Sequence, residues 1–119
     1  MKIETHTLSN IRIAEVLSDE IVLLTEEDGL DLMGNLYYQD FDRILLHEKN
    51  IAPDFFDLKT GLAGAILQKF SNYRVRLAIV GDFTPYTSGS LNDFIYESNK
   101  AGQVNFVSSL AEGLEKLAR

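Results

Sequence analysis

The sequence contains no cysteine among its 119 residues. This absence excludes disulfides, thiolate metal sites and cysteine nucleophiles, and it favours a reducing compartment. Long apolar runs are missing as well. No stretch approaches the ~18 apolar residues that a membrane span needs, and residues 1–6 lack the apolar segment of a secretion signal. We therefore expect a cytoplasmic protein that does not bind membranes.

Basic residues are in the minority, because 11 Lys and Arg stand against 18 Asp and Glu and leave a formal net charge of −7. A negative field repels phosphate backbones, so nucleic-acid binding is not expected. The hydrophobic fraction of 45% is ordinary for a globular protein. The length suits one domain, residues 1–119, and leaves no room for two.

Several familiar signatures are also absent. The sequence has no P-loop, no G-x-G-x-x-G fingerprint and no G-x-S-x-G nucleophile elbow. No histidine pair has a metal-ligand spacing such as H-x-x-x-H. We therefore predict neither a cofactor nor a metal, and no residue is identified as catalytic.

The chain does contain an alternation of strand-like and helix-like segments. Alternating and continuous apolar runs predict strands at residues 2–8, 11–17, 44–46, 75–80 and 104–107. Capping signals predict helices from Thr25 to about Tyr38, from Asp54 or Asp57 to about Asn72, from Ser90 to about Gly102, and from Ser109 to the C-terminus. The order β-β-α-β-α-β-α-β-α predicts a single α/β domain with a mostly parallel central sheet and flanking helices.

Two local features refine this prediction. Ser9-Asn10 is a turn signal, so the first two strands should form a hairpin. In the first helix, Leu30, Met33 and Tyr37 are expected to face inward. The pair Tyr37-Tyr38 at the end of that helix is also a candidate for an interface.

Polar residues follow two of the predicted strands, at the carboxyl ends where ligands bind in open α/β sheets. His47 and Glu48 follow the strand at 44–46, and Asp82 follows the strand at 75–80. If these strands are neighbours and parallel, their ends meet at one edge. We call this predicted region the carboxyl edge of the sheet.

Lys59 is a further candidate at the carboxyl edge. In a helix that begins at Asp54, it would lie near the middle of the apolar face. A lysine there needs a carboxylate partner, access to water, or the loss of its charge. The candidate partners are Glu48, Asp54 and Asp82. Lys59 would either form a structural ion pair with one of them or serve as a charged anchor for an anionic ligand or for a carboxylate of a partner protein.

His47 and Glu48 leave a strand side by side, so their side chains should point to opposite faces. His47 is interpreted first as a hydrogen-bonded residue at a strand end. A metal site would need His47 together with two or three of Asp54, Asp57 and Asp82, and no spacing supports it.

The residues from His47 through Gly61, with Ala78 to Phe83 and Asp93 to Asn99, resemble the bacterial domain of unknown function 4180 family. The likeness covers nearly the whole chain and implies no known activity.

The element order also resembles the STAS fold of anti-sigma-factor antagonists and sulfate-transporter tails. That resemblance implies partner binding and a phosphorylated Ser or Thr in a D-S-x-G-like motif. Here the region reads Asp57-Leu58-Lys59-Thr60-Gly61, which has an extra residue and no serine, and Thr60 is its nearest hydroxyl.

Two hypotheses for function follow. The first is a non-enzymatic regulatory or protein-interaction module that binds a protein partner or itself, for example as a homodimer. The second is a small-ligand site or small enzyme at the carboxyl edge. The candidate residues for either are His47, Glu48, Asp54, Asp57, Lys59, Thr60 and Asp82.

Overall fold

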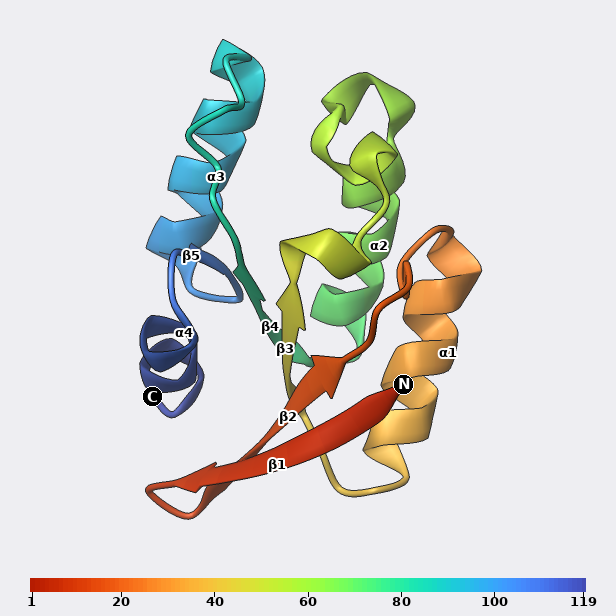
Figure 1. Cartoon of the computed structure of the whole chain (residues 1–119), viewed down its shortest axis with the longest axis vertical. Helices are drawn as coiled ribbons and strands as arrows, with labels where there is room; N and C mark the ends of the chain where they lie inside the picture. The colour runs from red at the N-terminus through yellow and green to blue at the C-terminus, as the bar shows by residue number, and fades with distance from the viewer.

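A five-stranded sheet runs through the computed structural model, which describes residues 1–119, in the spatial order β1-β2-β3-β4-β5 (Figure 1). Its strands are β1 (Lys2–Leu8), β2 (Ile11–Leu17), β3 (Arg43–His47), β4 (Arg76–Val80) and β5 (Val104–Val107). β1 and β2 pair antiparallel, and all later pairs are parallel. The predicted α/β fold, its mostly parallel sheet and the first hairpin are confirmed.

The hairpin closes through the two residues Ser9 and Asn10, which both have positive φ angles of 51° and 67°. Positive φ at both central positions is the geometry of a type I′ turn, whose twist matches that of the two flanking strands. The turn sets the register, with Leu8 opposite Ile11 and His6 opposite Ile13.

Four α-helices cover the sheet: α1 (Glu26–Tyr37), α2 (Leu62–Asn72), α3 (Gly89–Ala101) and α4 (Leu110–Leu117). Because strand order follows chain order, successive right-handed crossovers place α1, α2 and α3 on the same face of the sheet. α4 follows the last strand and packs on the opposite face, against β3, β4 and β5. No helix is both long and apolar enough to cross a membrane.

Alternation along the strands divides the core between these two faces. The larger cluster contains Ile44, Leu46, Leu77 and Ile79 and packs under α1, α2 and α3. The smaller cluster consists of Ile13, Leu45, Ala78 and Leu117 and lies under α4. The central strands therefore bury both faces, as their continuous apolar runs predicted.

The predicted long helix from Asp54 or Asp57 to Asn72 is wrong in its first third. Residues Pro53–Phe56 and Leu58–Thr60 form two short 3₁₀ helices, and α2 begins only at Leu62. The Asp57 side chain accepts from the backbone N–H of Lys59, and Thr60 Oγ1 donates to the carbonyls of Asp54 and Asp57. These local bonds compete with helix formation, and Gly61 adopts a left-handed conformation with φ 76° that separates the two segments.

The start of α1 is as predicted, but part of its inward face is not. Thr25 and Asp28 form the predicted capping box, with 3.2 and 3.0 Å bonds between side chain and backbone N–H. Met33 is buried as expected. Leu30 and Tyr37 are exposed instead, because Leu32 and Leu36 set the phase of the buried face.

Candidate functional site

The two strand ends of the predicted carboxyl edge do meet. β3 and β4 are hydrogen-bonded neighbours that run parallel, with Leu45 opposite Ala78 and His47 opposite Val80. Glu48 follows β3 directly and Asp82 follows β4 after Gly81, and the backbone N–H of Asp82 donates to Glu48 Oε1 at 3.1 Å. The geometric premise of the sequence analysis is therefore confirmed for these two residues.

Glu48 is fully engaged by its neighbours. Its Oε2 accepts a 2.6 Å hydrogen bond from the Tyr86 hydroxyl, in addition to the bond from Asp82. Gly81 makes this approach possible, because a Cβ at that position would lie 2.6 Å from Glu48 Cβ. The Tyr86 ring stacks on Phe56 with centroids 5.1 Å apart. Both carboxylate oxygens of Glu48 are thus hydrogen-bonded by groups of the protein itself.

Burial, and then the hydrogen bond to Glu48, raise the pKa of Tyr86 from 10.0 to about 12. A raised pKa means that the bond stabilises the fold below pH 10 and that this stabilisation is lost as the pH rises toward 12. We expect Tyr86→Phe to lower the free energy of unfolding by about 2 kcal/mol at pH 7. The deficit should shrink in urea unfolding curves recorded above pH 10. The exposed Tyr96 supplies the control, and a Tyr96→Phe variant with the same deficit would contradict the prediction.

Asp82 is exposed and turns away from the strand ends. Its Oδ1 accepts from the hydroxyl of Thr84 at 2.6 Å and from the Thr84 backbone N–H at 3.0 Å. These two bonds lower the pKa of the Asp82 carboxyl. Asp82 therefore caps its own turn through its side chain, and only its backbone reaches Glu48.

His47 points to the other face of the sheet, as the alternation predicted, and there it belongs to a different cluster. Its Nε2 lies 2.7 Å from Glu15 Oε2, while His6 Nε2 lies 2.8 Å from Glu15 Oε1. Glu15 is 5% exposed, so β1, β2 and β3 are joined through one buried carboxylate. We call this group the His–Glu–His bridge.

Glu15 remains ionised in this position through its two partners. Burial alone would raise the pKa of its carboxyl, but the hydrogen bonds and charges of His47 and His6 outweigh burial and lower it. Both imidazoles direct Nε2 at a carboxylate oxygen, and no group of three His, Asp or Glu side chains in the chain could hold a metal ion. The three side chains thus form a hydrogen-bonded contact that links β1, β2 and β3.

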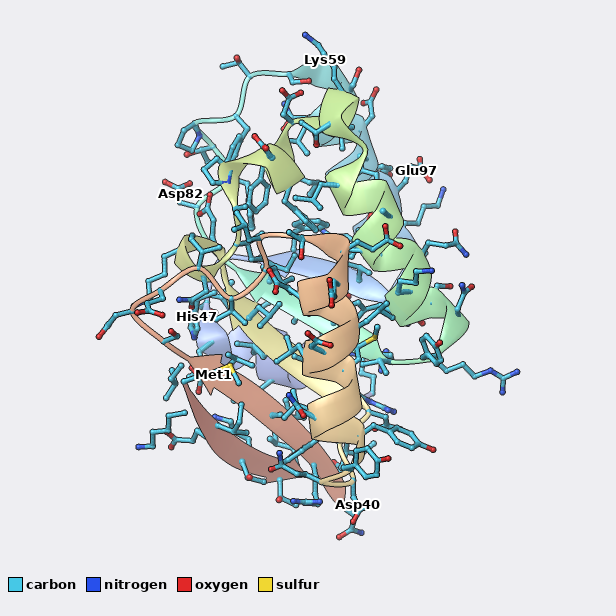
Figure 2. The ribbon with its side chains drawn as sticks, turned by 90° about the vertical axis from the view of Figure 1, so that its right-hand side faces the viewer. Met1, Asp40, His47, Lys59, Asp82 and Glu97 are labelled. Carbon is cyan, nitrogen blue, oxygen red and sulfur yellow. The ribbon has the colours of Figure 1, made fainter.

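The remaining candidates do not join the carboxyl edge. Lys59 is exposed and forms no ion pair, so the prediction that it faces the sheet is wrong. The physical reason is the 3₁₀ segment, which replaces the helical turn that would have pointed it inward. Figure 2 shows Lys59 at one end of the molecule, with its side chain directed away from Asp82. Asp54, Asp57 and Thr60 are exposed and engaged in the local bonds of the same segment.

A hollow at the carboxyl edge is small and open. It has a volume of about 310 Å³, and Glu48, Lys49, Phe56 and Tyr86 are among its lining residues. His47, Lys59 and Asp82 do not line it. The structure thus brings Glu48 and the backbone of Asp82 together and leaves the other predicted residues apart.

A larger groove lies at the opposite end of the sheet, near the amino ends of β3 and β4. Its volume is about 770 Å³, and its lining residues are Leu30, Met33, Gly34, Tyr37, Tyr38, Asp40, Tyr73 and Val75. Six of these eight residues are hydrophobic. We call it the tyrosine groove. Asp40 marks this end in Figure 2, on the far side of the molecule from Lys59.

The floor and walls of the tyrosine groove differ in exposure. Met33 and Val75 are buried beneath it, whereas Tyr37, Tyr38 and Tyr73 are 69%, 91% and 64% exposed. Tyr37 and Tyr38 end α1, and Tyr73 lies in the turn between α2 and β4. Large aromatic side chains are thus presented to solvent around an apolar floor.

Sequence reasoning identified Tyr37 and Tyr38 as interface candidates but missed Tyr73, Glu15, His6 and Tyr86. A signal for the His–Glu–His bridge did exist. The predicted two-residue turn places His6 opposite Ile13, which puts it diagonally next to Glu15 on the same face. Nothing local to Tyr73 or Tyr86 indicated where either side chain would lie.

Comparison with known proteins gives one family and one similar structure. A family model described as a domain of unknown function (DUF4180) matches residues 8–117. No curated protein matches the sequence. The structure is similar to the crystal structure of a candidate anti-sigma factor antagonist from Thermotoga maritima, with a TM-score of 0.47 and 13% identity over 98% of this chain and 95% of that chain.

Proposed function

We propose that this chain, which belongs to the DUF4180 family, acts as a non-enzymatic regulatory module by binding a protein partner in its tyrosine groove. The groove itself is the observation that supports this function. It combines a buried apolar floor with three tyrosines that are each more than half exposed. Tyrosine is enriched at protein interfaces, where it supplies a large contact area and a polar tip at low entropic cost.

The charge around the groove indicates the chemistry of the partner. Asp40 is the charged residue that lines it. α1, which forms one wall, has no basic residue, and its acidic residues Glu26, Glu27 and Asp28 lie in its first turn at the far end from the groove. Arg74, between Tyr73 and Val75, is the basic residue next to the groove. With a net charge of −7 on the chain, a segment with apolar side chains and a basic flank would be attracted. The lack of cysteine favours a cytoplasmic partner.

The carboxyl edge offers less support for the alternative of a small-ligand site or enzyme. Glu48 is hydrogen-bonded by Tyr86 and by the backbone of Asp82, and Lys59 lies elsewhere. A catalytic constellation needs several groups that converge on one reacting atom. The groups predicted for that role point in different directions, so the groove is the better-supported site.

The test begins with capture in living cells. A photoreactive phenylalanine analogue placed at Tyr38 should cross-link a partner protein, whereas the same analogue at Tyr96, an exposed tyrosine on α3, should not. The captured protein is then purified and its affinity for the unlabelled chain is measured. Cross-linking only identifies the partner, and the affinities of the variants for that partner test the proposed function.

We expect the double variant Tyr38→Ala/Tyr73→Ala to weaken that affinity by at least about tenfold. Tyrosine is enriched among the interface residues whose truncation costs about 2 kcal/mol or more, and about 1.4 kcal/mol is tenfold in affinity. Tyr96→Ala, which removes a tyrosine of similar exposure, should bind as the wild type does. Equal affinity of the groove variant and the wild type for the purified partner would refute the proposed function.

A further inference from the structure

The two edge strands of the sheet differ in whether their outward backbone groups have hydrogen-bond partners. At one edge, β5 is four residues long, and Asn99 of α3 pairs with its free backbone groups. Phe106 N donates to Asn99 Oδ1 at 2.7 Å, and Asn99 Nδ2 donates to Phe106 O at 3.2 Å. This side chain occupies the backbone groups that another strand would use.

The other edge, β1, has no such protection. It is seven residues long, contains no proline and pairs in unbroken register with β2. Figure 1 shows β1 at the edge of the sheet, with β2 on one side only. Leu8 and Ile11 flank the two-residue turn and so form a hydrogen-bonded pair. Alternation along the ladder then directs the backbone groups of Ile3, Thr5 and Thr7 outward. No hydrogen bond within the chain engages these outward groups.

We propose that a second copy of this chain pairs with the exposed edge of β1, so that the two β1 strands run antiparallel about a two-fold axis at Thr5. A two-fold antiparallel contact is self-complementary and closes a dimer. The axis at Thr5 sets Thr5 opposite its own copy and Ile3 opposite Thr7. All three outward-facing residues of each strand are then matched, and the sheet continues from one copy into the other.

Side-chain charge favours the same register. With the axis at Thr5, Glu4 lies opposite His6 of the second copy, on the same face of the joined sheet. Moving the axis to Glu4 sets two glutamates opposite each other, while moving it to His6 sets Glu4 opposite Leu8 and leaves it without a polar partner. Like charges directly opposite are destabilising in an antiparallel pair. Both shifts also leave one outward-facing residue unmatched.

This contact is separate from the partner site. The tyrosine groove is formed by α1, the turn after it and the turn before β4, and none of its residues lies in β1. The dimer thus carries two grooves. A substitution at one surface leaves the residues of the other unchanged, so the two proposals succeed or fail independently.

The absence of cysteine gives a direct test of the register, because a single introduced thiol can react only with its own copy. In the proposed dimer the Cα atoms of opposite Thr5 residues lie about 5.5 Å apart, within the range of about 4.4–6.8 Å that a disulfide spans. The two Thr7 residues lie four positions apart along the strands, about 13 Å. Under mild oxidation Thr5→Cys should form a covalent dimer at least tenfold faster than Thr7→Cys.

Sedimentation of the wild-type chain tests the dimer itself. We expect a monomer–dimer equilibrium whose dissociation constant rises at least tenfold in Thr5→Pro, which loses an outward N–H but no bond to β2. Thr5→Val keeps that N–H and should behave as the wild type does, and far-UV circular dichroism verifies that each variant is folded. A wild-type monomer at all concentrations refutes the proposal. A dimer in which Thr7→Cys cross-links as fast as Thr5→Cys refutes it too, because that dimer uses another surface or register.

Discussion

Glu15→Ala is expected to lower the free energy of unfolding by about 3 kcal/mol at pH 7, because it removes the shared centre of the His–Glu–His bridge. His6 and His47 both lose a charge-assisted hydrogen bond shorter than 3 Å, and such bonds contribute about 1.5–3 kcal/mol each. The bridge joins β1, β2 and β3, so its loss also loosens the hairpin. Urea unfolding followed by circular dichroism measures the effect.

The isosteric variant Glu15→Gln separates charge from shape through its pH dependence. The pKa of Glu15 is lowered in the folded protein from its ordinary value of 4.5, so the unfolded chain takes up a proton first as the pH falls. The stability that this carboxylate contributes is therefore present above pH 4.5 and is lost as the pH falls below it. We expect the difference between the wild type and Glu15→Gln to be greatest near neutrality and to shrink toward pH 3.

Glu4 provides a matched control for both variants. It pairs with Glu15 across the hairpin but is exposed. Measured at a concentration low enough for the chain to be monomeric, so that the contact between β1 strands plays no part, Glu4→Gln should change the free energy of unfolding by less than about 0.5 kcal/mol. If the difference in free energy of unfolding between Glu15→Gln and the wild type is the same at pH 7 and at pH 3, the carboxylate is not held ionised by the two histidines.

Arg76→Met is the second substitution with a large expected effect, about 3 kcal/mol. The Arg76 guanidinium donates to the carbonyl of Gly102 at the end of α3. It also donates to the backbone oxygen of Lys116 in the last turn of α4 at 3.0 Å, and to that of Arg119, just past the helix, at 2.8 Å. A cation at a helix C-terminus satisfies carbonyls that have no partner within the helix and complements the negative end of the helix dipole. Methionine keeps much of the apolar stem but none of these bonds.

The effect of Arg76→Met is measured both as the free energy of unfolding of the whole protein and as hydrogen exchange in individual helices. Amide hydrogen exchange in α4 should accelerate more than exchange in α1, because Arg76 ties α4 to β4. Arg74→Met is the control, since Arg74 is exposed and forms no hydrogen bond or ion pair through its side chain. Equal destabilisation by the two substitutions would show that the contacts of Arg76 with the helix ends contribute little.

Much of the architecture could be predicted because it is encoded in short stretches of sequence. The continuous run Ile44-Leu45-Leu46 indicated a strand buried on both faces, and both of its faces are covered. Thr25 with Asp28 located the start of α1, and Ser9-Asn10 located the hairpin turn. Each of these signals depends on residues that are close in sequence, and periodicity and capping describe such residues well.

The site was harder to predict because its residues are assembled from distant segments. Lys59 was placed on the sheet side by assuming regular helix from Asp54, and the hydroxyl of Thr60 and the carboxylate of Asp57 removed that regularity. His47 was expected at the carboxyl edge, whereas its partner Glu15 lies on β2. The groove required Tyr73 to come beside the end of α1, which only the packing of α1 against α2 determines.

The identity of strand order and chain order has a consequence for how the protein folds. Every strand pairs with the strand that precedes it in the chain, so no pairing has to wait for a distant segment. Chains whose contacts join nearby residues fold faster than chains of similar size with distant pairings, because less entropy is lost in closing each loop. We therefore expect rapid folding for a protein with a parallel sheet. The sheet can also grow strand by strand while the ribosome is still synthesising the chain, with α4 packing last.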